Sequence, residues 1–277
     1  MNRASMSCAS KPALTLFATL LLLAAGPALS DSAQRQRARV FASLPDWSGI
    51  WEAEAWADIT IAGRPAGGIA AVRAKSVLSA IPPYNAEWRA QYQAALKDTA
   101  ALRAAATTSK VCEFGFPGVL ESPALFQIAV TPEETLFIFS TREVRHVYTD
   151  GKPLPPREDL WPSFLGHSIG HWDGQTLVID TVERVASAPL RFSSPLVKLS
   201  DRARFTEKLR LVSEDRLEDQ ITVDDPIALE KPWQLTLSYR RVTNLDRMID
   251  FNCTENDRNP VVDGKITIAP AHEHGSQ

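Results

Sequence analysis

The sequence has few cysteines and no more than one long apolar run. That run, Ala13–Ala25, follows the basic residues Arg3 and Lys11 and precedes the small residues of Ala28–Ser30. This order is typical of a secretory signal peptide, and the run is shorter than the ~20 apolar residues that span a bilayer. We therefore predict a signal peptide over residues 1–30 and a periplasmic or secreted protein that is not embedded in the membrane.

Only three cysteines are present in the 277 residues. Cys8 lies in the predicted signal peptide, so the exported chain keeps Cys112 and Cys253. Two distant cysteines in an oxidising compartment favour one disulfide, which would close a long loop and restrict the unfolded chain. We predict a Cys112–Cys253 disulfide, with two buried thiols as the alternative.

A strong positive charge is also missing. Residues 31–277 keep 28 of the 30 basic residues, all but Arg3 and Lys11, against all 33 acidic ones, which leaves a formal charge of −5. Binding to nucleic acid needs a basic surface, so we expect no nucleic-acid partner. The sequence contains no phosphate loop, dinucleotide fingerprint or compact metal-ligand motif, so we expect no cofactor and no metal site.

What is present is a succession of short strands with turn residues between them. A polar leader over residues 31–45 precedes them, and a helix is predicted near residues 85–106, where Asn85 suits an N-cap. The predicted strands cover Trp47–Glu52, Phe126–Val130, Thr135–Phe139, Val144–Thr149, 167–172, 175–183, Phe205–Val212, Leu217–Val223 and Trp233–Val242. Many short strands with local turns are typical of an antiparallel sandwich or barrel.

We favour a barrel, because adjacent hairpins close naturally and leave no exposed edge. Gly49-Ile50-Trp51 opens the first predicted strand and resembles the Gly-x-Trp start of lipocalins. The fold prediction is therefore an all-β, antiparallel, lipocalin-like barrel over residues 46–258, with an inserted helix and a C-terminal tail over residues 259–277.

Two longer runs, Tyr148–Pro153 and Gly166–Thr181, resemble signature motifs of a family of exported bacterial proteins without an established activity. The likeness continues in Asp224–Pro226, Pro232–Trp233 and Cys253–Asn256. It implies export and a single β-rich domain, and it implies no particular reaction.

The hairpin around Asp173-Gly174 carries the candidate chemistry. A two-residue turn at these positions pairs Trp172 with Gln175 and, further along, His167 with Asp180. Such neighbours have Cβ atoms ~5 Å apart, so the aspartate would hold one tautomer of the histidine for general acid–base catalysis. An ordinary surface pair is the alternative, because the sequence does not say which face of the hairpin points inward.

Two other interpretations of this region are weaker. Gly166–Gly170 fits the G-x-S-x-G nucleophile elbow, but that elbow joins a strand to a helix and this run lies in a hairpin. His146, His167 and His171 are of the right type for a three-histidine zinc site, although their spacing forms no ligand motif.

Three functions follow. The leading hypothesis is an exported barrel that binds a small apolar or aromatic molecule, with Trp51, Trp172, Trp233 and His171 at the ligand. The alternative is a cofactor-independent lyase, isomerase or hydrolase, with His167 as base, Asp180 orienting it, and Tyr148 or His146 as partner acid. The third is a structural protein of the cell envelope.

Overall fold

The computed structural model describes residues 26–56, 80–98, 115–122, 124–186, 197–248, 250, 261–262 and 265–266. Helix α1 (Gly26–Ser43) belongs to a unit separate from the rest of the chain, and it begins inside the predicted signal peptide. Most of that peptide, Cys112 and Cys253 lie outside the described residues, so export and the disulfide stay predictions. Among the described helices, none combines the length and apolar character needed to cross a membrane.

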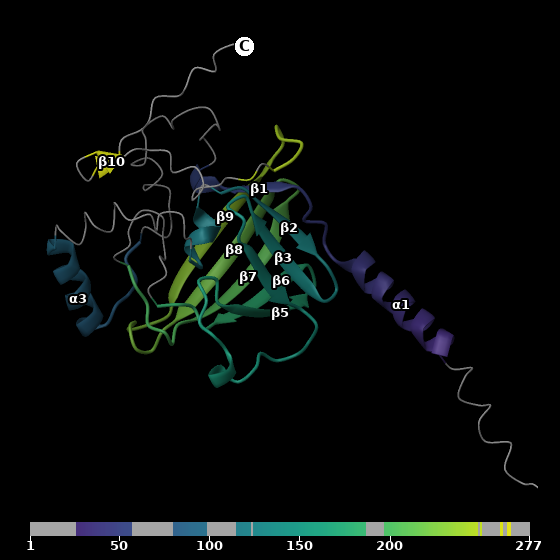
Figure 1. Cartoon of the computed structure of the whole chain (residues 1–277), viewed down its shortest axis with the longest axis horizontal. Coiled ribbons are helices and arrows are strands. Elements are labelled where there is room, and N and C mark those ends of the chain that lie inside the picture. Colours follow the sequence, from purple (N-terminus) through teal and green to yellow (C-terminus); the bar gives the residue numbers. More distant parts are fainter. Residues whose placement is uncertain are drawn as a thin grey trace, which may run out of the picture. The chain divides into compact units, whose positions relative to one another are not determined.

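Nine strands close into a barrel in the order of the chain, with the last strand pairing with the first (Figure 1). They are β1 (Ile50–Ala53), β2 (Phe126–Val130), β3 (Glu134–Phe139), β4 (Val144–Tyr148), β5 (His167–Asp173), β6 (Thr176–Val182), β7 (Arg204–Ser213), β8 (Arg216–Asp224) and β9 (Trp233–Val242). The predicted all-β barrel is confirmed, and each predicted strand recurs with small differences at its ends. A separate pair, β10 (Val261–Val262) and β11 (Lys265–Ile266), falls in the predicted tail.

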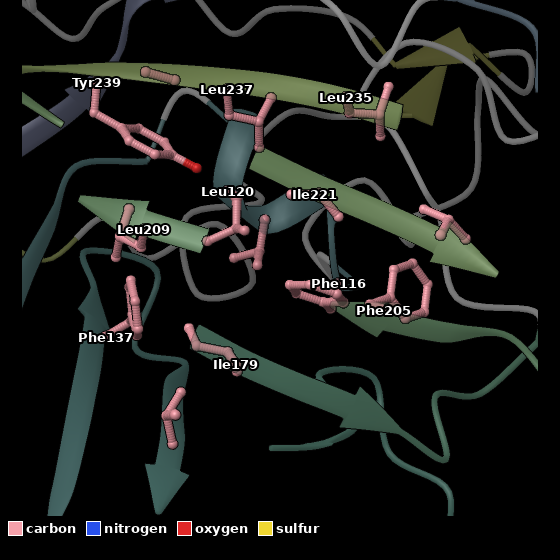
Figure 2. Packing of buried hydrophobic residues seen from close by; sticks show 14 of the residues in the cluster. Phe116, Leu120, Phe137, Ile179, Phe205, Leu209, Ile221, Leu235, Leu237 and Tyr239 are labelled. Atoms are coloured by element: carbon pink, nitrogen blue, oxygen red, sulfur yellow. The ribbon is translucent and has the colours of Figure 1, made fainter. Parts of the chain in front are cut away.

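The strands form where apolar and polar residues alternate, because side chains of a strand point to opposite faces of the sheet. In β7, for example, Phe205 and Leu209 are buried inside while Lys208 and Arg210 are exposed outside. Figure 2 shows inward side chains of β6 to β9 packed around Phe116 and Leu120. These two residues belong to the segment that contains the 3-10 helix η4 (Gly118–Glu121), so this segment fills part of the barrel interior.

One pair of neighbouring strands is parallel. Val147 and Tyr148 of β4 pair with Ser168 and Ile169 of β5, so the sheet is mixed and not wholly antiparallel as predicted. A tight hairpin cannot join parallel strands, which need a crossover of about a dozen residues or more. Residues 149–166 make this crossover. Because lipocalins are eight-stranded up-and-down barrels, the nine mixed strands give the lipocalin-like part of the prediction no support.

Helix α3 (Ala86–Lys97) is the predicted helix, and its start agrees with the sequence. Asn85 is the N-cap, and its side-chain oxygen accepts a hydrogen bond from the Trp88 backbone N–H at 3.0 Å. The helix ends earlier than predicted, with Asp98 as its C-cap, and residues 99–106 lie outside the described part. Trp88 and Tyr92 pack on Tyr84, whose ring lies 6.2 and 5.9 Å from theirs.

Candidate functional site

A charged pair lies in the barrel interior. Arg145 of β4 donates to both carboxylate oxygens of Glu207 of β7, at 2.8 and 2.5 Å, and both side chains are 1% exposed. The guanidinium also donates to Thr181 Oγ1 at 2.8 Å and to Ser168 Oγ at 3.2 Å. The Phe116 ring covers it, 4.2 Å from the guanidinium carbon. Burial of an ion pair is costly unless further hydrogen bonds satisfy both groups, and these hydroxyls meet that need.

This ion pair accounts for the polar residues of the Gly166–Thr181 motif that point into the barrel. Ser168 and Thr181 supply the hydroxyls, and their oxygens lie 2.8 Å apart. A Cβ on Gly170 would approach Val147 Cγ1 and the Val178 carbonyl oxygen to 3.0 Å each, so this inward position stays small. Ser168 is buried within a strand and bonded to Arg145, so it is not the exposed serine that a nucleophile elbow presents between a strand and a helix.

The hairpin register differs by two residues from the prediction. Asp173 pairs with Thr176, so Gly174 and Gln175 form the turn, and Asp180 consequently faces Ile169 while His167 faces Val182. The predicted division of the hairpin into two faces is unchanged by this shift. The histidine face is the outer face of the barrel, since Ser168, Leu177, Ile179 and Thr181 of the other face are buried.

His167 and Asp180 have separate partners, so the predicted dyad was wrong. His167 Nε2 lies 2.7 Å from the carbonyl oxygen of Trp161, and Asp180 Oδ1 accepts from Thr206 Oγ1 at 2.8 Å. His146 Nδ1 lies 2.9 Å from Glu134 Oε2, and its ring stacks on exposed Tyr148 at 5.9 Å. The four predicted catalytic residues therefore share the outer surface without forming one hydrogen-bonded unit.

A row of paired residues nevertheless crosses this outer face. Tyr148 pairs with Ile169, Ile169 with Asp180, and Asp180 with Thr206. Neighbouring strands lie ~4.8 Å apart, so the row places residues of four strands within reach of one small molecule. Both long motifs contribute to it, since Tyr148 begins one of them and Ile169 and Asp180 belong to the other.

A groove of about 790 Å³ lies between the crossover segment and the outer face of β5 to β7. Ile169, Asp180 and Thr206 of this row line it, and Tyr148 does not. Its volume is typical of small-molecule sites, which measure roughly 300–1,000 Å³. The apolar lining residues include Leu154, Leu160, Ile169 and Val182, and the exposed charged ones are Asp180, Asp201, Arg202, Arg204 and Asp224. The groove thus combines an apolar floor with charges of both signs.

Arg157 holds the crossover segment in place. Its Nε lies 2.6 Å from Glu183 Oε1, and its Nη2 donates to the Asp201 carboxylate and carbonyl oxygens at 3.1 Å each. Two backbone bonds connect Ser163 with Glu183 and Val185 at 3.0 and 2.9 Å. The groove therefore has an anchored wall, which follows from the crossover that the parallel pair requires.

The predicted aromatic pocket was wrong. Trp51 is fully buried, donates from Nε1 to the Trp47 carbonyl at 3.0 Å, and is covered by Arg241 at 4.3 Å. Trp172 points inward and packs against Trp47 at 5.1 Å. Trp233 begins β9 and is eight residues away from Arg241, the residue that pairs with Trp51. Eight residues of a strand span ~26 Å, so Trp233 lies far from Trp51. His171 is exposed on the outer face.

Across the described ranges, no three or more His, Cys, Asp or Glu side chains gather so that they could hold a metal ion. Neither the protein-family models, the curated proteins nor the solved structures include a match to this chain. The evidence for a site is therefore the geometry alone. Sequence reasoning included Asp180 but missed Arg157 and Arg204, because only the course of the crossover brings these arginines to the same groove.

Proposed function

We propose that this protein binds a small molecule in the outer groove beneath residues 154–160. The observation that carries the proposal is the groove itself, in which the apolar side chains of Ile169 and Val182 lie beside Asp180 and Arg204. Ligand sites in proteins are mostly apolar with a few placed polar groups that orient the ligand. A molecule with an apolar or aromatic body and at least one charged group fits this lining.

The groove is a better position for the ligand than the barrel interior. Around Arg145 the interior is occupied by the Glu207 carboxylate and the Phe116 ring, and both belong to the core of the fold. A ligand there would have to displace them. In the groove a ligand meets a surface that is already formed, so little ordering entropy is lost on binding.

Fluorescence titration with anilinonaphthalene sulfonate tests the proposal, since this dye has an aromatic body and one anionic group. Ile169→Trp fills the groove floor and should weaken dye binding by about tenfold or more, that is by at least ~1.4 kcal/mol. Val178→Trp is the matched control, because Val178 is also a half-buried outward residue of the same hairpin and does not line the groove. Equal dye affinity in both variants and the parent would refute the assignment of the site.

We also propose that the protein acts outside the cytoplasm. The support is the order of Arg3 and Lys11, the apolar run Ala13–Ala25 and the small residues of Ala28–Ser30. N-terminal sequencing of protein recovered from a bacterial periplasm should begin at Asp31. A chain that keeps its first thirty residues in that fraction would contradict the proposal.

A further inference from the structure

A second acidic residue lies beside the buried ion pair. Asp219 of β8 points inward between Leu209 and Leu237 and is 2% exposed. It is the diagonal neighbour of Glu207, because Glu207 pairs with Ile221 two residues further along β8. Side chains in this relation are ~7 Å apart or less at Cβ, and carboxyl groups can meet across that distance.

The charges around Asp219 do not balance if every group is ionised. Glu207 from β7 and Arg145 from β4 act directly on Asp219. Tyr239 from β9 lies close to Asp219 and Glu207, and the charge of Glu121 from η4 also acts on this tyrosine. Arg145 is the cation among them, and its two Nη atoms both donate to Glu207. Two adjacent ionised carboxylates in a buried site repel each other, and the usual outcome is that one of them keeps its proton.

The hydrogen bonding of Asp219 agrees with a retained proton. Among the described residues its Oδ1 has no partner, and neither has the buried hydroxyl oxygen of Tyr239. An ionised carboxylate at this position would be a buried charge whose Oδ1 has no donor, whereas a protonated carboxyl can donate to Glu207. Burial raises the pKa of Asp219 well above its usual range, and the negative charge of Glu207 raises it further.

We propose that Asp219 and Glu207 form a buried proton-binding site, in which Asp219 keeps its proton at neutral pH and donates it in a hydrogen bond to Glu207, whose charge Arg145 balances. This site is independent of ligand binding in the groove. Its consequence is a barrel whose stability falls as the pH rises above about 4, since the unfolded chain then releases the Asp219 proton while the folded barrel still holds it.

The sign follows from proton linkage. The unfolded chain loses the Asp219 proton near pH 4, while the folded barrel keeps it to a higher pH. Between these two values the folded state binds one proton more than the unfolded state. The folding equilibrium constant therefore decreases by up to about tenfold for each pH unit in this window, and it becomes independent of this site above the folded pKa.

The direct test observes the carboxyl group in the intact protein. The side-chain carboxyl carbon of Asp219 is followed by ¹³C NMR from pH 5 to pH 9 and is assigned from its loss in Asp219→Asn. We expect the chemical shift of the protonated form at pH 6 and pH 7. A shift of the ionised form already at pH 5 would overturn the proposal.

Urea unfolding over the same pH range provides the second test. Asp219→Asn keeps an uncharged hydrogen-bonding group of the same size, so it should remove the decrease in stability that the parent shows as the pH rises. Asp173→Asn is the matched control, because Asp173 is an exposed carboxylate at the end of β5, and it should keep the decrease seen in the parent. An unchanged pH dependence in Asp219→Asn would refute the retained proton on Asp219.

Discussion

Arg145 of β4 and Glu207 of β7 are joined by two hydrogen bonds across the barrel interior, although β5 and β6 lie between their strands in the sheet. The pair therefore connects β4 with β7, two strands that no backbone hydrogen bonds connect directly. It also determines what the neighbouring inward positions must provide, namely the hydroxyl groups of Ser168 and Thr181.

Truncation of the arginine should destabilise the barrel strongly. Arg145→Ala leaves the buried Glu207 carboxylate without its cation, and breaking a buried pair in this way typically costs about 3–5 kcal/mol of unfolding free energy. Equilibrium unfolding in urea measures the loss. The double variant Arg145→Leu with Glu207→Leu removes both charges, and it should lose much less stability than Arg145→Ala. A double variant as unstable as the single one would show that packing, and not the unpaired charge, sets the cost.

Substitution of Gly166 should destabilise the protein more than substitution of Gly174, although the two glycines have similar backbone angles. Gly166 and Gly174 have φ values of +70° and +60°, where an L side chain costs roughly 1–2 kcal/mol. An added Cβ on Gly166 would also lie 2.7 Å from Thr181 Cγ2 and 2.8 Å from the Val182 carbonyl oxygen, whereas Gly174 has nothing within 4 Å. Thermal unfolding should therefore show a larger loss for Gly166→Ala than for Gly174→Ala, and equal losses would contradict the close contact.

Removal of the Arg157 side chain should lower both the stability of the protein and the affinity of the groove for the dye. Arg157→Ala deprives the Glu183 carboxylate, whose side chain is 8% exposed, of its cation, and an unsatisfied buried group costs about 1–3 kcal/mol. We expect this loss in urea unfolding together with weaker dye binding. Lys152→Ala is the control on the same segment, since its pair with Asp150 is solvent-exposed and should contribute little to stability. Dye affinity that survives Arg157→Ala would place the ligand elsewhere.

The two cysteines that follow the predicted signal peptide should be linked. Peptide mass spectrometry without reductant is expected to find Cys112 and Cys253 in one disulfide-linked pair, and Cys253→Ser should lower the unfolding free energy by about 2–4 kcal/mol. Modification of both thiols by an alkylating reagent in the folded, unreduced protein would exclude the bridge.

Local patterns in the sequence were enough to predict the strands. Alternation places Phe205 and Leu209 on one face of β7, and Asn85 is the N-cap of α3 as its residue type suggests. The hairpin register could not be predicted in the same way. Asp173-Gly174 and Gly174-Gln175 are both acceptable two-residue turns, because glycine suits either central position. The pairing of the whole barrel selects the second turn, which separates His167 from Asp180.

The sequence by itself determined that this chain forms an all-β domain of short strands, where those strands lie, and which residues of the central hairpin share a face. The tertiary structure alone decided which face of the hairpin points into the barrel, because the inward hydroxyls of that face bind Arg145, which in turn pairs with Glu207 on a strand distant in sequence. It also decided the parallel pairing of β4 with β5, and hence the crossover that forms the groove. Strand formation follows from local side-chain periodicity, whereas the partners of buried charges and the course of a crossover depend on contacts between distant parts of the chain.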